Sequence, residues 1–193
     1  VGASTAYHLS LRGIKALVIE RSSVAAAASG KAGGFLAGGW GSGPTVRMHE
    51  VSFDMHEKLA ETLGVTSYRK IPTLQVNGAR RGSSPAAWLD GQASGSMMDT
   101  DTAQVTPLEL TTKLMDAAKA RGAEVRIAAV EGVSSAPVGS SEGKSEAAAG
   151  AERKITGVVL EGGEEVPCDR VIVAMGPWSC IAEDWFGIPI PMQ

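Results

Sequence analysis

The chain has 193 residues, of which 44% are hydrophobic and 5% aromatic, and its formal net charge is −3. This composition is typical of an α/β protein with an aliphatic core. It gives no basic footprint for nucleic acid, and no apolar run reaches the roughly 20 residues of a membrane-spanning helix.

The first predicted element is a helix from Gly2 to about Leu11, made of small residues at its start and released by Gly13. Residues 15–20 then form a short apolar strand that ends in Glu20. We expect this strand to be parallel and buried on both faces, because it is almost entirely apolar.

This order is the second half of a dinucleotide-binding βαβ unit. Gly2 takes the place of the third glycine of a G-x-G-x-x-G loop, and Glu20 that of the acid that binds the ribose. Arg21 would suit a 2′-phosphate, but Glu20 would repel that group. Because the leading strand and the first two glycines are absent, we expect the chain to be a fragment.

An Ala/Gly-rich segment, residues 24–43, follows and is expected to be a loop. Its part Ser29–Gly34 reads SGKAGG, and glycines let a backbone approach a bulky ligand closely. We expect the amides of Gly30, Gly33 and Gly34 to face a pyrophosphate or the polar edge of a flavin. A nicotinamide-binding unit usually continues into a crossover helix, so this loop favours FAD over NAD.

A second helix is predicted at 46–63, closed by Gly64, with one apolar face formed by four residues: Val51, Met55, Leu59 and Leu63. Short strands are expected near 66–69 and 73–76, before a polar stretch at 77–95.

The next helix has the clearest start in the chain. Thr106 is a predicted N-cap, Pro107 occupies the first helical position, and Glu109 completes a capping box. The helix is expected to reach Arg121, and a strand should follow at 124–129.

Residues 134–154 carry almost no large apolar side chain and are predicted to be a disordered surface insertion. After them, 155–160 and 166–174 are expected to pair as strands around the turn Glu161–Glu164.

The cysteines and histidines give no catalytic or metal-binding pattern. Cys168 and Cys180 have no C-x-x-C spacing and no nearby histidine pair, which favours reduced thiols and a cytoplasmic location. His8, His49 and His56 have no third ligand or carboxylate partner, so we expect structural roles and no metal site.

The chain resembles the FAD-dependent oxidoreductases of the D-amino-acid oxidase, glycine oxidase and sarcosine oxidase superfamily. The similarity covers nearly the whole chain apart from 77–95 and 134–154. The segments that carry it are, in order, Gly2, Glu20, Ala28–Gly34, Val105–Pro107, Gly122–Val125 and Val171–Ser179.

The resemblance implies an α/β fold: a Rossmann-like FAD-binding domain, incomplete here, with part of an inserted α+β substrate domain. The FAD-binding domain would comprise 1–45 and 106–193, and the substrate or cap domain would include 46–105. It also implies that Val130 contacts adenine and that Ala174 and Gly176 lie beside FAD. The candidate cofactor-binding residues are Gly2, Glu20, Arg21, Ser29, Gly30, Ala32, Gly33, Gly34, Val130, Ala174 and Gly176.

The implied activity is oxidation of a C–N bond in a small amine or amino acid by hydride transfer to the flavin. We name no catalytic residue, because most of the substrate-binding residues are expected beyond Gln193, and the fragment itself is expected to be inactive. Two alternatives stay open: a non-enzymatic FAD-binding regulatory protein and an NAD-dependent dehydrogenase.

Overall fold

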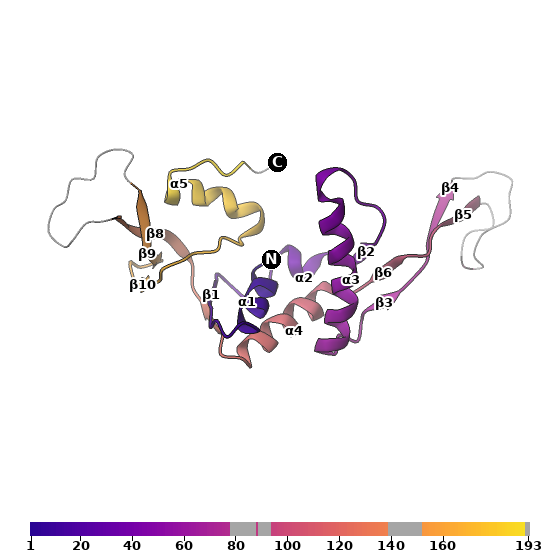
Figure 1. Ribbon diagram of the computed structural model, residues 1–193, viewed down its shortest axis with the longest axis horizontal. Helices are drawn as coiled ribbons and strands as arrows, with labels where there is room; N and C mark the ends of the chain where they lie inside the picture. The colour runs from indigo at the N-terminus through magenta and orange to yellow at the C-terminus, as the bar shows by residue number, and fades with distance from the viewer. Residues whose placement is uncertain (78–87, 89–93, 139–151, 192–193) are drawn as a thin grey trace. The chain divides into compact units, whose positions relative to one another are not determined.

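The computed structural model describes residues 1–77, 88, 94–138 and 152–191. The chain divides into two compact units (Figure 1). The first consists of Val1–Ala26 with Leu114–Gln193, and the second of Ala27–Lys113. The boundaries between the units therefore fall near residue 26 and inside the helix α4 (Pro107–Lys119). The assignment of 1–45, 46–105 and 106–193 to cofactor and substrate domains stays a prediction.

The first unit begins with α1 (Gly2–Ser10) and β1 (Leu17–Glu20). Gly13 adopts φ +76°, a left-handed conformation that ends the helix and turns the chain toward the strand. β1 pairs in parallel with β7 (Glu124–Ile127), which agrees with the expectation that β1 is a parallel strand; the sequence did not predict this partner. The positions of α1, β1 and β7 therefore agree with the sequence prediction.

The burial of β1 differs from the prediction. Leu17 is exposed, and the other three residues of the strand are half-buried. Among the described residues β1 pairs with β7 alone, so its other edge has no strand to cover it. The apolar composition of a strand shows that it can be buried. The elements that pack beside it determine how much of it is buried.

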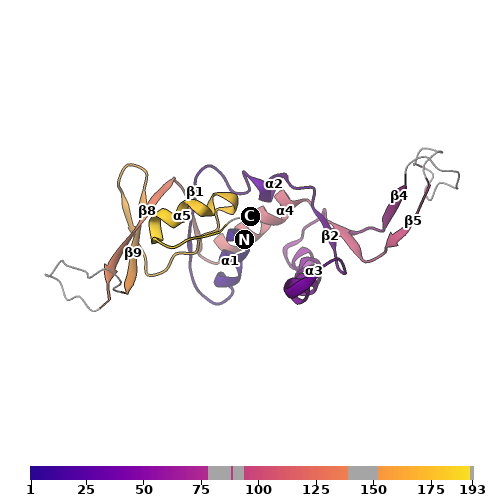
Figure 2. The ribbon, with the colours of Figure 1, turned by 90° about the horizontal axis from the view of Figure 1, so that it is seen from above.

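An antiparallel sheet completes the first unit, in the order β10-β9-β8. Figure 2 shows two of its strands, β8 and β9. Its strands are β8 (Val130–Pro137), β9 (Arg153–Leu160) and β10 (Glu165–Pro167). Leu160 on β9 is almost fully buried. Residues 134–137 and 153–154 are thus strand, contrary to the predicted disordered insertion, while 139–151 lie outside the described residues. Both segments are strand because β8 and β9 pair with each other, with Ser134 opposite Gly157 and Pro137 opposite Arg153.

The end of the first unit also corrects a prediction. The strand expected at 166–174 is limited to β10, and Val171–Ala174 has no ladder partner among the described residues. An extended apolar segment becomes a strand only where another backbone offers hydrogen bonds to it. The chain continues as η2 (Gly176–Ile181) and α5 (Ala182–Phe186).

The second unit contains the long helix α3 (Val46–Leu63), two small sheets and the short elements α2 (Ala28–Lys31) and η1 (Gly43–Thr45). The three-stranded antiparallel sheet has the order β2-β6-β3, and β4 and β5 form a hairpin. These strands are β2 (Phe35–Ala37), β3 (Arg69–Lys70), β4 (Thr73–Asn77), β5 (Ser94–Asp99) and β6 (Thr102–Gln104). Segment 24–43, expected to be a loop, thus contains α2 and β2.

Helix α3 has the predicted bounds but buries a different face. Its buried residues are Phe53 and Ala60, whereas on the expected face Val51 and Met55 are exposed and Leu59 and Leu63 are half-buried. Phe53 lies against Gly38, where an added Cβ would be 3.1 Å from the Phe53 Cδ1 atom. The aromatic side chain, with its large apolar area, therefore sets the orientation of the helix.

Glu109 in the first turn of α4 makes contacts that the capping-box prediction did not anticipate. Its carboxylate accepts hydrogen bonds from the amides of Thr66 and Ser67, at 2.8 and 3.0 Å, and from the Thr66 hydroxyl at 3.0 Å. Hydrogen bonding from the Ser67 side chain, and then from the Thr66 amide, lowers the pKa of Glu109 to about 2. This acid ties the turn after α3 to the start of α4.

Candidate functional site

In the first unit the start of α1 lies against the segment that precedes η2. A Cβ atom built on Gly2 would lie 3.4 Å from the Cβ of Ala174, which is ordinary van der Waals contact. A side chain larger than alanine at position 2 would therefore press on Ala174. The structure thus brings together two candidate residues that are 172 positions apart in the chain.

The first turn of α1 provides backbone donors suited to an anion. Val1 is the N-cap, it makes no side-chain hydrogen bond, and the turn contains no acidic residue. The first amides of a helix have no intrahelical acceptor, and the helix dipole favours negative charge there. A pyrophosphate is the group that this arrangement accommodates in dinucleotide-binding folds.

Glu20 stands at the carboxyl end of β1, as predicted. Its side chain is half-buried, and its Oε1 atom accepts a hydrogen bond from the Ser22 amide at 3.1 Å. The backbone oxygen of Glu20 accepts from the Ala128 amide at 2.9 Å. This bond places the carboxyl end of β1 beside the segment that leads into Val130. Arg21, next in the chain, is exposed.

Glu20 and Gly2 lie toward the same edge of the first unit, because the chain reverses at Gly13 between α1 and β1. The Glu20 Oε2 atom has no hydrogen bond within the described residues, so it is available to a ribose hydroxyl. Gly176 begins η2 with φ +59°, two residues after Ala174. Gly2, Glu20, Val130, Ala174 and Gly176 therefore all belong to one unit.

The other candidates, Ser29–Gly34, belong to the second unit. The Gly30 amide donates to the Ala27 oxygen at 3.0 Å, and the Ala32 amide donates to the Ala28 oxygen at 3.1 Å. Both amides are thus used within the turn of α2. The backbone oxygen of Ser29 accepts from the Thr111 hydroxyl at 3.3 Å.

Gly34 has a structural requirement that does not involve a ligand. It adopts φ +74°, and a Cβ atom there would lie 1.8 Å from the Val105 oxygen. The Val105 amide also donates to the Gly34 oxygen at 2.9 Å. Gly33 is different, because an added Cβ would meet nothing within 4 Å. Sequence reasoning gave both glycines one role, and the structure distinguishes them.

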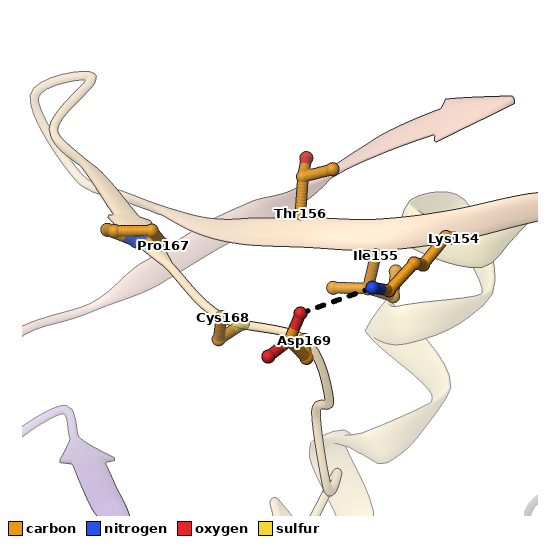
Figure 3. Close-up of a pocket in the computed structure, with 6 residues that line it drawn as sticks. All are labelled: Lys154, Ile155, Thr156, Pro167, Cys168 and Asp169. Carbon is orange, nitrogen blue, oxygen red and sulfur yellow. Dashed lines mark ion pairs between the residues drawn. The ribbon is translucent and has the colours of Figure 1, made fainter. Parts of the chain in front are cut away.

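A hollow with a volume of about 310 Å³ lies along β9 and the end of β10 (Figure 3). Its lining residues are Lys154, Ile155, Thr156, Pro167, Cys168 and Asp169. The Lys154 ammonium and the Asp169 carboxylate form an ion pair across it at 3.3 Å. No candidate cofactor-binding residue lines this hollow, so we do not assign it to the cofactor.

The histidines make local contacts. His49 Nε2 bonds to the Ala37 oxygen, and His56 Nδ1 bonds to the Ser52 oxygen at 2.7 Å. Within the described part of the chain, no cluster of three histidine, cysteine or acidic residues could hold a metal ion. No helix in that part is long and apolar enough to cross a membrane.

The helices and the parallel strand pair of the first unit define an α/β protein. A family model described as "DAO: FAD dependent oxidoreductase" matches residues 1–193. The chain belongs to this family of FAD-dependent oxidoreductases. The predicted family, its α/β fold and its cofactor, FAD, are thereby confirmed.

Solved structures with the same fold include glycine oxidase from Bacillus cereus ATCC 14579, with a TM-score of 0.74 and 22% identity over 96% of this chain and 57% of that one. L-proline dehydrogenase from P. horikoshii has a TM-score of 0.73 and 18% identity, and the match covers 97% of this chain and 53% of that one. L-amino acid deaminase from Proteus vulgaris has a TM-score of 0.70 and 19% sequence identity, and the match covers 98% of this chain and 48% of that one. The chain spans about half the length of the solved structures it matches.

Sequence reasoning missed the partners that hold the candidates in place. The Ser22 amide binds the side-chain carboxylate of Glu20, and the Ala128 amide binds its backbone oxygen. The backbone of Val105 contacts Gly34. Both strands, β1 and β7, could be predicted one by one, because each follows a helix and a glycine with positive φ, Gly13 and Gly122. The contact between Gly34 and Val105 could not be predicted from the sequence, because it joins two backbones and does not depend on the Val105 side chain.

Proposed function

We propose that the protein is an FAD-dependent oxidoreductase that oxidises a C–N bond of a small amine or amino acid. The observation that carries this proposal is the family match over all 193 residues. The similar structures include glycine oxidase, L-proline dehydrogenase and L-amino acid deaminase, which are all enzymes of amino acids. We assign the activity to the complete gene product, because the structures matched are about twice as long as this chain.

The residues of the first unit fit the adenosine diphosphate half of FAD. The first-turn amides of α1 would bind the pyrophosphate, and Gly2 keeps that turn close to Ala174. The free oxygen of the Glu20 carboxylate would accept a hydrogen bond from the ribose. Val130 would lie near the adenine through its backbone, and Gly176 near the same edge.

Ser29, Gly30, Ala32, Gly33 and Gly34 stay predicted cofactor contacts, as does Arg21. Among the glycines of the loop, Gly33 fits this role best, because its amide has no hydrogen bond within the described residues and its Cβ position is open. Gly34 would contribute by holding the loop on Val105. We propose a cytoplasmic location on the cysteine usage alone.

When bound, FAD would supply the two-electron oxidation of the substrate C–N bond by hydride transfer, with dioxygen or another two-electron acceptor as the final oxidant and the imine product hydrolysed by water. The protein's part is to orient the cofactor through its pyrophosphate and ribose. No residue of this chain is assigned to proton transfer.

The test is the spectrum of the purified complete gene product. Visible flavin bands, release of FAD on denaturation and anaerobic bleaching by amino acids or small amines are expected. A protein that holds FAD but is bleached by no amine would be the non-enzymatic FAD-binding protein. A protein that takes up no FAD from excess, or binds NAD in its place, would contradict the proposal.

A further inference from the structure

The second unit presents two exposed aromatic rings beside a carboxylate. Phe35 begins β2, and Trp40 follows three residues after its end. The ring centroids are 5.2 Å apart with an interplanar angle of 50°, and the residues are 47% and 44% exposed. The Trp40 indole Nε1 donates to the Asp99 Oδ2 atom at 2.7 Å. Large rings exposed in this way offer contact area to a ligand.

The backbone before Trp40 is fixed at Gly38. The Gly38 amide donates to the Asp101 oxygen at 3.1 Å. Gly38 is buried, and an added Cβ would lie 2.6 Å from the Asp101 carboxylate and 3.1 Å from Phe53. The segment that leads to Trp40 is therefore packed between Asp101 on one side and Phe53 of helix α3 on the other.

The backbone after Trp40 is fixed by His49. Its ring lies so close to Gly41 that an added Cβ would be 3.0 Å from the His49 Cγ atom. The same ring bonds through Nε2 to the oxygen of Ala37. Trp40 is thus held on both sides while nearly half of its surface stays exposed. A side chain held in this way loses little conformational entropy when a ligand binds.

Asp99 supplies a negative charge at the edge of the indole. Its Oδ1 atom accepts from the Asp101 amide at 2.7 Å, and its Oδ2 atom accepts from Trp40. The Asp101 amide, and then the Trp40 indole, lower the pKa of Asp99. No lysine or arginine of the described residues forms an ion pair with Asp99. The charge is therefore uncompensated beside an exposed π face.

We propose that Trp40, Phe35 and Asp99 bind the alkylammonium group of an organic cation, the nitrogen end of the amine substrate in the function proposed above. The ring faces attract a weakly hydrated cation through their quadrupoles and cover its alkyl groups. Asp99 adds charge attraction and holds the indole. A metal ion fits poorly, because no three histidine, cysteine or acidic residues of the described part of the chain gather here to hold one. Positions 40 and 99 would thus contribute to substrate specificity.

The test uses fluorine NMR of the complete gene product labelled with 5-fluorotryptophan. The signal that disappears in Trp40→Phe identifies Trp40, and Trp178, 49% exposed in the first unit, is assigned through Trp178→Phe as a matched control. The probe is choline, compared with 3,3-dimethylbutan-1-ol, which has the same shape but no charge. Saturable movement of the Trp40 signal with choline alone is expected, while Trp178 stays still.

Asp99→Asn keeps the size of the side chain and should weaken choline binding about twofold to fivefold, the range of an exposed ion pair. Asp116→Asn, an exposed acid on α4, should leave binding unchanged. Equal response to the neutral alcohol, equal movement of Trp178, or no effect of Asp99→Asn would overturn the proposal. The flavin bands of the same sample report separately on the oxidoreductase function, so either proposal can fail without the other.

Discussion

Gly34 and Gly33 provide a direct test of the difference between a packing glycine and a ligand-facing glycine. An alanine at position 34 would have to adopt φ +74°, which costs about 1 kcal/mol for a residue with a Cβ. Its Cβ would also overlap the Val105 oxygen, at 1.8 Å. Moving that backbone disturbs the hydrogen bond from the Val105 amide to Gly34 and adds about 2 kcal/mol. We expect Gly34→Ala to lower the free energy of unfolding by about 3 kcal/mol.

Gly33→Ala is the matched control, because position 33 has no positive φ and an open Cβ site. Its free energy of unfolding should stay within about 1 kcal/mol of wild type. Guanidinium unfolding of the FAD-free complete gene product, followed by circular dichroism, measures both variants. If Gly34→Ala unfolds at the wild-type midpoint, the packing account of Gly34 is wrong. If Gly33 contacts FAD as predicted, Gly33→Ala should bind FAD more weakly while its free energy of unfolding stays unchanged.

Two further substitutions test the acids. Glu20→Gln should keep the bond to Ser22, weaken FAD binding about tenfold through loss of a charged acceptor, and leave unfolding nearly unchanged. Glu124→Gln on the exposed start of β7 is its control, and equal FAD dissociation constants for the two variants would exclude the ribose role. The pKa of Glu109 is lowered from 4.5 to about 2 in the folded state, so its contribution to stability is present above pH 4.5 and is lost as pH falls toward 2. Glu109→Gln should therefore reduce stability at neutral pH and flatten the acid dependence in that window, whereas Glu61→Gln should match wild type in denaturation at each pH.

The local signals in the sequence predicted the regular elements near their observed bounds where glycine ended a helix. Gly13 and Gly64 both adopt left-handed conformations at such ends, and α1 and α3 stop where those residues predict. Proline at position 107 marked the start of α4 in the same way. These signals act within one turn, so they need no knowledge of tertiary contacts.

The errors arose where a distant partner decides the outcome. β6 was not predicted, because the segment has only three residues and both of its end residues are polar. It becomes a strand by pairing with β2 and β3. The face of α3 was set by Phe53 against Gly38. Glu109 fitted a capping box, but the amides of the turn after α3 bind it instead.

The candidate site shows the same division. Gly2 and Glu20 were found from spacing along the chain, and the contact of Gly2 with Ala174 agrees with the resemblance that selected Ala174. The cluster of Phe35, Trp40 and Asp99 was not found, because Asp99 lies on an unpredicted strand 59 residues from Trp40.

The central claim is that this chain holds FAD for an oxidoreductase. The most direct measurement is to purify the complete gene product, denature it and identify the nucleotide that is released. One equivalent of FAD per chain, with an FAD dissociation constant about tenfold higher in Glu20→Gln, is the result we predict. Absence of FAD even after incubation with an excess of it, or release of a nicotinamide nucleotide in its place, would contradict the account.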